Sequence, residues 1–173
     1  TLLVALFLVA FAQDPIDTEA PPDIFQNGES VALDTAIPAN ERGIVCLAVD
    51  ERGRVFGGTA GRAAHLFVYD PANTQLRSLV RLEGGIGFAH QLVRLPDGSF
   101  LVGTQADPTG VAERTEAQAV GQLYRIVLGE SSPAKIEQLG VPVPGQGIYT
   151  LAYLEKVDQI AGNTWPDGHF FVY

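Results

Sequence analysis

The chain has 173 residues, a formal net charge of −9 and 46% hydrophobic residues, with 19 glycines and 11 prolines. This length and composition are typical of a soluble globular domain. The acidic balance leaves no basic stripe that could neutralise phosphates, so we do not expect a nucleic-acid-binding protein. The single cysteine, Cys46, excludes an internal disulfide framework. We interpret it as a small buried hydrophobe on a strand rather than as a nucleophile.

Residues 1–12 form a continuous apolar run that ends in Ala10-Phe11-Ala12, a small-x-small cleavage pattern. This run is typical of a secretory signal peptide whose basic start is missing, and it is shorter than the ~20 residues that span a bilayer. A buried helix is the alternative. We expect an exported protein, secreted or periplasmic, without a membrane span after cleavage. Residues 13–28 are rich in proline and acidic side chains, and we predict that they form a flexible tether.

One pattern then occurs three times: an apolar run, a tight turn, and a second run that ends in threonine. The three endings are Gly57-Gly58-Thr59, Val102-Gly103-Thr104 and Gly162-Asn163-Thr164, and each precedes a loop and an aromatic-rich run. A repeat of about 40–50 residues with four short strands is typical of a β-propeller blade. We predict an all-β fold of four-stranded antiparallel blades at approximately 43–82, 87–140 and 147–173.

The predicted blades number about two and a half, so the ring is incomplete. The expected strands are 44–49, 54–58, 65–69 and 76–82, then 89–95, 99–103, 123–128 and 136–139, then 149–154, 159–162 and 169 onward. Residues 29–38 are similar to the end of the second blade, and we expect them to form an orphan outer strand that completes a last blade. Because the chain has no methionine and ends within a repeat, we expect it to be the N-terminal fragment of a longer protein.

The segments GTAGRAAHLFVYDP, LPDGSFLVGT and GNTWPDGHFFVY carry a resemblance to a known group. From roughly Glu29 to Tyr173 the chain resembles secreted bacterial β-propellers of the broad group that contains streptogramin-lyase-like and quinoprotein-like repeats. The resemblance is specific for architecture and implies no single activity, because propellers host enzymes, glycan binders and scaffolds alike.

The loops that lead into the first and third strands of each blade must open on one rim, because these two strands run in the same direction. His65, His90 and His169 all fall at the ends of those loops. Aligning the repeats gives His90 and Tyr149 the same position near the start of the innermost strand, where the first blade has Val45. We therefore expect His90 to stand beside Tyr149 at the mouth of the central channel, a common place for a ligand.

His90 and Tyr149 are the candidate catalytic residues. Histidine titrates near neutral pH, and tyrosine can act as the partner acid or base. With a cation that neutralises a uronate carboxylate, such a pair suits β-elimination from an acidic polysaccharide, and Arg62 or Arg114 could supply that charge. The architecture is similar to that of propeller-fold polysaccharide lyases such as ulvan and oligogalacturonate lyases, which use His-centred sites of this kind.

The candidate substrate-binding residues are His65, Arg62, Trp165, Asp167, His169 and Gln91. Trp165 could stack on a sugar face or simply pack within its turn. The three histidines could instead converge on a divalent metal, and no other cofactor is indicated. The long polar segment between Gln105 and Gln122 is typical of either a functional lid or a disordered loop.

We expect an exported propeller that binds an extracellular carbohydrate or another small ligand on this rim. A polysaccharide lyase is the first alternative, and a structural or protein-interaction propeller is the second. In a purely structural interpretation, His65 and His169 cap the starts of strands and His90 is a satisfied interior residue. A cluster of His, Tyr and Arg would favour the enzyme, whereas aromatic side chains on a neutral rim would favour the binding protein.

Overall fold

The computed structural model describes residues 30–34, 36–82, 85–106, 120–129 and 134–173. Ala32–Tyr173 forms one compact unit, and all of the described strands belong to it. The predicted signal peptide at 1–12, the predicted tether at 13–28 and Arg114 lie outside the described residues.

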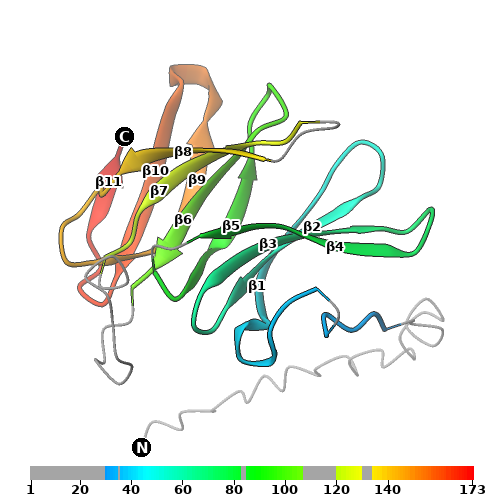
Figure 1. Cartoon of the computed structure of the whole chain (residues 1–173). Helices are drawn as coiled ribbons and strands as arrows, with labels where there is room; N and C mark the ends of the chain where they lie inside the picture. Colours follow the sequence, from blue (N-terminus) through cyan, green and yellow to red (C-terminus); the bar gives the residue numbers. More distant parts are fainter. Residues whose placement is uncertain (1–29, 35, 83–84, 107–119, 130–133) are drawn as a thin grey trace, which may run out of the picture. The chain divides into compact units, whose positions relative to one another are not determined.

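The first blade is an antiparallel meander in which each strand pairs with the next (Figure 1). Its strands are β1 (Gly43–Val49), β2 (Val55–Ala60), β3 (Ala64–Asp70) and β4 (Gln75–Leu82). The second blade repeats this order. Its strands are β5 (Gly87–Arg94), β6 (Phe100–Gln105), β7 (Leu123–Val127) and β8 (Lys135–Gly140). Both blades confirm the strands expected from the sequence.

The third blade has three described strands. They are β9 (Gly147–Leu154), β10 (Gln159–Trp165) and β11 (Phe170–Val172). They form an antiparallel sheet in which β10 is central. Two short 3₁₀ helices, at Ala39–Glu41 and Glu155–Val157, are the helical segments that the described residues contain.

Aspartate side chains build the turns between the first two strands of blades 1 and 2. In the β1–β2 turn, Oδ1 of Asp50 accepts a hydrogen bond from the backbone N–H of Arg54 at 2.9 Å. In the β5–β6 turn, Oδ1 of Asp97 accepts hydrogen bonds from the backbone N–H and the hydroxyl of Ser99, at 3.0 and 2.6 Å. Aspartate is favoured in turns because its carboxylate binds backbone N–H groups two residues further on. The bonds from Ser99, together with that from Arg125, lower the pKa of Asp97 to about 2.

A buried threonine closes the loop after the second strand of each blade. Its hydroxyl accepts a hydrogen bond from the backbone N–H of the residue that begins the next segment. The three pairs are Thr59–His65 (3.3 Å), Thr104–Gln122 (3.0 Å) and Thr164–His169 (3.0 Å). The threonine that marks the repeat in the sequence therefore has the same structural role in all three blades.

Apolar side chains fill the spaces between consecutive blades. Between blades 1 and 2, the rings of Phe56 and Phe100 lie 4.8 Å apart, within a larger buried cluster. Between blades 2 and 3, Ile148 packs with Leu101 and Leu123. Gly103 is required there, because a Cβ atom at this position would lie 2.6 Å from Cγ2 of Ile148.

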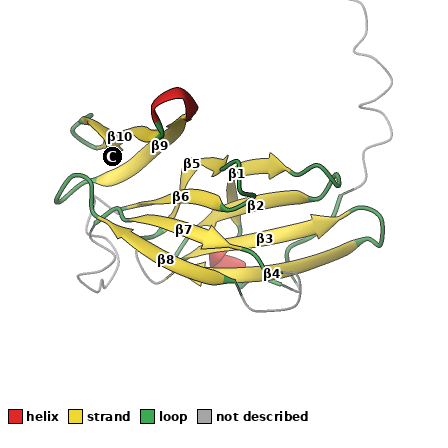
Figure 2. Ribbon diagram, turned by 90° about the horizontal axis from the view of Figure 1, so that it is seen from above, coloured by secondary structure: helices red, strands yellow, loops and turns green. Residues whose placement is uncertain are grey.

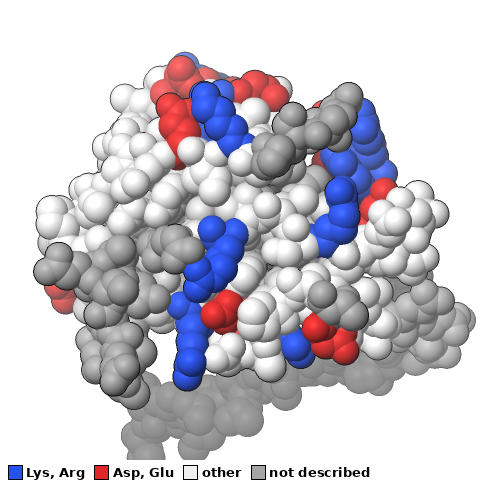
Figure 3. All heavy atoms as spheres, viewed as in Figure 1, with Lys and Arg blue, Asp and Glu red and all other residues white. Residues whose placement is uncertain are grey.

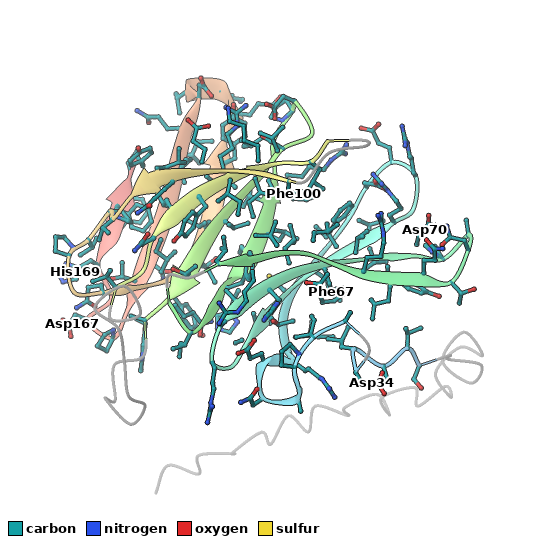
Figure 4. The ribbon with its side chains drawn as sticks, in the orientation of Figure 1. Asp34, Phe67, Asp70, Phe100, Asp167 and His169 are labelled. Atoms are coloured by element: carbon teal, nitrogen blue, oxygen red, sulfur yellow. The ribbon has the colours of Figure 1, made fainter. Side chains whose placement is uncertain are left out.

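The segment before β1 differs from the predicted outer strand at 29–38. Its described residues form turns and belong to none of the strands. Leu33 and Ile37 pack on Phe67 of β3, because this ring offers them an apolar surface. Phe67 is labelled in Figure 4. The pairing of this segment with another blade therefore stays a prediction.

The strand order is β4-β3-β2-β5-β6-β7-β8, with β1 paired to β2, beside the separate sheet β11-β10-β9. Blades 1 and 2 join at one backbone pair, Ala60 with Gly87. The larger antiparallel sheet curls through 221°, and Figure 2 shows its strands from above. The chain is therefore all-β, with two four-stranded blades and part of a third from a β-propeller whose ring is incomplete.

Candidate functional site

A β-bulge interrupts the innermost strand of each blade near its start. Val45 in β1, residues 89–91 in β5 and Tyr149 in β9 lie between paired residues and have no ladder partner. A bulge places an extra residue outside the ladder and changes the direction of its side chain. The bulges therefore coincide with the position at which the repeats align Val45, His90 and Tyr149.

His90 and Tyr149 contact each other across the boundary between blades 2 and 3. Their ring centroids lie 4.6 Å apart, and the ring planes are inclined by 62°, an edge-to-face arrangement. Both side chains are exposed, and Tyr149 is 45% accessible. The prediction that the two rings stand side by side is confirmed, while their chemical role stays a prediction.

Gln105 at the end of β6 is the polar neighbour of this pair. Its amide Nε2 donates a hydrogen bond to Nε2 of His90 at 3.4 Å. A ligand that needs the lone pair of Nε2 would have to displace Gln105.

A cavity of about 310 Å³ opens beside the His90–Tyr149 pair, between the ends of β6 and β10 and the start of β9. Its described lining residues are Gln105, Ala106, Gly147, Ile148, Tyr149 and Trp165, none of which carries a charge. Trp165 is 55% accessible. Within the described part of the chain, neither the Trp165 indole N–H nor the Tyr149 hydroxyl has a hydrogen-bond partner, so both can bind a ligand.

The loop that carries Trp165 is closed at its base and held from one side. Thr164 N–H donates to the carbonyl of His169 at 2.9 Å, and His169 N–H returns a bond to the Thr164 hydroxyl. Within the loop, Asp167 makes two hydrogen bonds with the side-chain amide of Gln146, at 2.8 and 3.0 Å. Figure 4 shows Asp167 and His169 together at this end of blade 3.

The other candidate residues do not join the cavity. His65 is 4% accessible, and its Nε2 lies 2.5 Å from Oε2 of Glu41, itself a buried side chain. Arg62 is exposed in the loop between β2 and β3, and Gln91 is exposed in the β5 bulge. His169 is exposed, with its backbone in the loop closure described above.

The structural interpretation therefore fits His65, whose backbone closes the loop and whose ring is paired. It does not fit His90, which is exposed. Cys46 is buried, and burial raises the pKa of its thiol to about 11, which is the behaviour expected of a structural cysteine. Nowhere in the described ranges do three or more His, Cys, Asp or Glu side chains gather as metal ligands, so the three histidines do not form one metal site there.

A second, larger cleft of about 950 Å³ lies at the opposite ends of blades 1 and 2, beside the aspartate turns. Two of its arginines are paired with acids: Arg54 with Asp50 at 2.6 Å and Arg94 with Glu51 at 3.2 Å. On the face in Figure 3, the described basic and acidic side chains form several groups that lie next to one another. The cleft thus has mixed charge and lacks the exposed aromatic rings of the smaller cavity.

Two residues of the candidate site were not expected from the sequence. Gln105 ends β6 as Trp165 ends β10, and both follow the repeat threonine by one residue. Extending the repeat alignment by one position would have identified it. Gln146 precedes β9 in the sequence, but no local pattern indicates its contact with Asp167, 21 residues away.

No protein-family model matches the chain, and no curated protein matches it significantly. Among the described residues, no helical segment has the length and apolar character needed to cross a membrane.

Proposed function

We propose that this chain is part of an exported bacterial β-propeller that binds a carbohydrate in the cavity between blades 2 and 3. One observation carries the proposal: two exposed aromatic rings, Trp165 and Tyr149, flank a cavity of about 310 Å³ whose described lining residues carry no charge. Aromatic side chains offer a large apolar face together with a polar tip, which suits the apolar face and the hydroxyls of a sugar ring. The Gln105 amide supplies directional hydrogen bonds at the same cavity, as expected for a small-molecule site.

Trp165 provides both the test and the signal, because it is the only tryptophan in the chain. The full chain is titrated with soluble neutral oligosaccharides and with uronate oligosaccharides, and Trp165 fluorescence is recorded. We expect a saturable change with at least one neutral glycan. Tyr149→Phe and Gln105→Ala should each weaken binding about fivefold to tenfold, because each removes one hydrogen bond to the ligand.

Gln75→Glu, on an exposed residue in β4, is the control and should bind as the unmodified protein does. Calorimetry with Trp165→Ala checks the role of the ring itself. Binding that is unaffected by Trp165→Ala, or the absence of binding to every glycan in the panel, would contradict the proposal.

The alternative is a polysaccharide lyase, and the contact between His90 and Tyr149 favours it. In such a reaction one side chain removes the proton next to the uronate carboxylate and the other protonates the departing glycosidic oxygen. This chemistry also needs a group that neutralises the carboxylate, and the described lining of the cavity contains no Lys or Arg. Binding of a neutral glycan is therefore the better supported function.

The lyase is tested by incubating the full chain with uronate polysaccharides and following the ultraviolet absorbance of the unsaturated product. Product that disappears in His90→Ala would establish the lyase and replace the binding proposal. The third possibility is a structural propeller. In that case alanine at His90, Tyr149 or Trp165 would change neither the binding of any ligand nor any activity.

A further inference from the structure

Gln146 lies directly before β9, at the boundary between blades 2 and 3. Both the nitrogen and the oxygen of its side-chain amide form a hydrogen bond. Nε2 donates to Oδ2 of Asp167 at 2.8 Å, and Oε1 accepts from the backbone N–H of Asp167 at 3.0 Å. Gln146 is 9% accessible. A buried amide that satisfies one acceptor and one donor of a single residue fixes that residue in both position and orientation.

The backbone of Gln146 is fixed from the other blade. Its carbonyl accepts a hydrogen bond from the N–H of Gly121 at 2.7 Å, and its own N–H donates to the carbonyl of Val143 at 3.3 Å. Gly121 adjoins Gln122, whose N–H binds the Thr104 hydroxyl at the end of β6. Gln146 therefore connects the end of blade 2 with the loop of blade 3 that carries Trp165.

The side-chain amide is not needed to join two blades. At the boundary between blades 1 and 2, the N–H of Gly61 donates to the carbonyl of Ile86 at 2.8 Å, which is the same backbone bond with an apolar side chain. The amide is thus an addition at the boundary that holds the cavity. Its partner, Asp167, is two residues from Trp165, the aromatic wall of that cavity.

We propose that Gln146 is a positioning residue, which holds the 165–168 loop so that Trp165 faces Gln105 across the cavity before any ligand arrives. The consequence for affinity rests on the function proposed above, whereas the effect on Trp165 does not. Holding a contact residue in its bound orientation reduces the entropy that binding costs.

The hydrogen-bond pattern allows a test by exchange of donor and acceptor. Gln146→Glu keeps an acceptor for the Asp167 N–H but places a second carboxylate against Oδ2. Asp167→Asn alone should be nearly silent, because its amide oxygen can still accept from Gln146. In the double variant Gln146→Glu/Asp167→Asn, the new amide donates to the new carboxylate, which restores both bonds.

The readout without ligand is the quenching of Trp165 fluorescence by acrylamide, with fluorescence anisotropy as a second measure of mobility. We expect Gln146→Glu to increase the quenching constant and lower the anisotropy, and the double variant to return both to the values of the unmodified chain. Gln75→Glu makes the same chemical change on an exposed residue of blade 1 and should leave Trp165 unaffected. Equal quenching in Gln146→Glu and the unmodified chain, or no recovery in the double variant, would overturn the proposal.

Binding of the neutral oligosaccharides is then measured by calorimetry for the same variants. We expect Gln146→Glu to bind about tenfold more weakly, since a hydrogen bond to a charged group is lost, and the double variant to recover. If no glycan binds any variant while the quenching follows the expected pattern, the proposed function fails and the positioning role stands. If a glycan binds Gln146→Glu and the unmodified chain equally, the positioning role is overturned.

Discussion

His65, Gln122 and His169 occupy the same position in the three blades, directly after the loop that follows the second strand, but their side chains have different partners. The His65 ring is buried against Glu41, whereas His169 is exposed. The Gln122 amide oxygen accepts hydrogen bonds from Tyr124 and from a glutamine of β8. The shared property is the backbone N–H that binds a threonine hydroxyl, so likeness between the two histidines in sequence does not imply a shared ligand.

Cys46 gives a prediction at the scale of one residue. Burial raises the pKa of its thiol to about 11, and a backbone hydrogen bond with Gly58 offsets part of that increase. In the unfolded chain a cysteine has a pKa of about 8.5. Between these two values the unfolded state binds fewer protons than the native state, so the free energy of unfolding falls as pH rises; below about 8.5 Cys46 contributes no pH dependence.

The measurement is urea denaturation of the unmodified chain and of Cys46→Ala from pH 7 to pH 11. We expect the unmodified chain to lose stability more steeply above about pH 8.5 than the variant does. Parallel curves for the two proteins would contradict the buried thiol, as would rapid alkylation of Cys46 in the native protein at pH 8.

At the scale of the element, the threonine that ends each second strand allows a sharp substitution. Thr104→Val keeps the shape of the side chain but leaves the buried N–H of Gln122 without an acceptor. We expect the free energy of unfolding to fall by about 1–3 kcal/mol, which is the cost of an unsatisfied buried donor. Thr104→Ser retains the hydroxyl and is the control in the same urea titration; if Ser and Val destabilise equally, packing of the methyl group and not the hydrogen bond is responsible.

The strands were largely predictable because short-range patterns determine them. The apolar run before Thr59, the Asp97-Gly98 turn and the aromatic run after His65 each reflect local preferences, and the structure has a strand or turn at every one. Alignment of the repeats also placed His90 beside Tyr149. That prediction succeeded because equivalent positions of neighbouring blades lie next to each other.

Contacts between distant segments were not predictable in the same way. Glu41 meets His65 across 24 residues, and no spacing rule indicates that pair. Residues 29–38 are similar in sequence to the end of the second blade, but in the structure Leu33 and Ile37 cover Phe67. The tertiary surface available to an apolar side chain decided the outcome there, and that surface is not visible in a local pattern.

At the scale of the whole molecule, close backbone approach determines how blades meet. Gly87 begins β5, and a Cβ atom there would lie 2.4 Å from Cβ of Ala60 and 2.7 Å from its Cα, at the end of β2. Gly87→Ala must therefore push blades 1 and 2 apart. We expect it to lower the free energy of unfolding by about 1–3 kcal/mol, the usual cost of overpacking.

Gly43→Ala is the matched control, because Gly43 begins β1 as Gly87 begins β5. Its nearest neighbour is the Ala60 carbonyl oxygen at 3.1 Å, so a small displacement accommodates the methyl group. Thermal unfolding of both variants would show whether the loss of stability arises at the boundary between the blades. If Gly43→Ala is as destabilising as Gly87→Ala, the loss arises from the strand itself rather than from the boundary between blades.

In a regular strand, each residue must both pair with the neighbouring strand and present its side chain, whereas the bulges separate these two requirements. A residue outside the ladder contributes no cross-strand pair, so its identity is free of the demands that β-sheet formation makes on its neighbours. Valine, histidine and tyrosine already occupy this position in the three blades. The residue at this position can therefore differ from blade to blade, by evolution or by design, while the pairing of the strands stays the same.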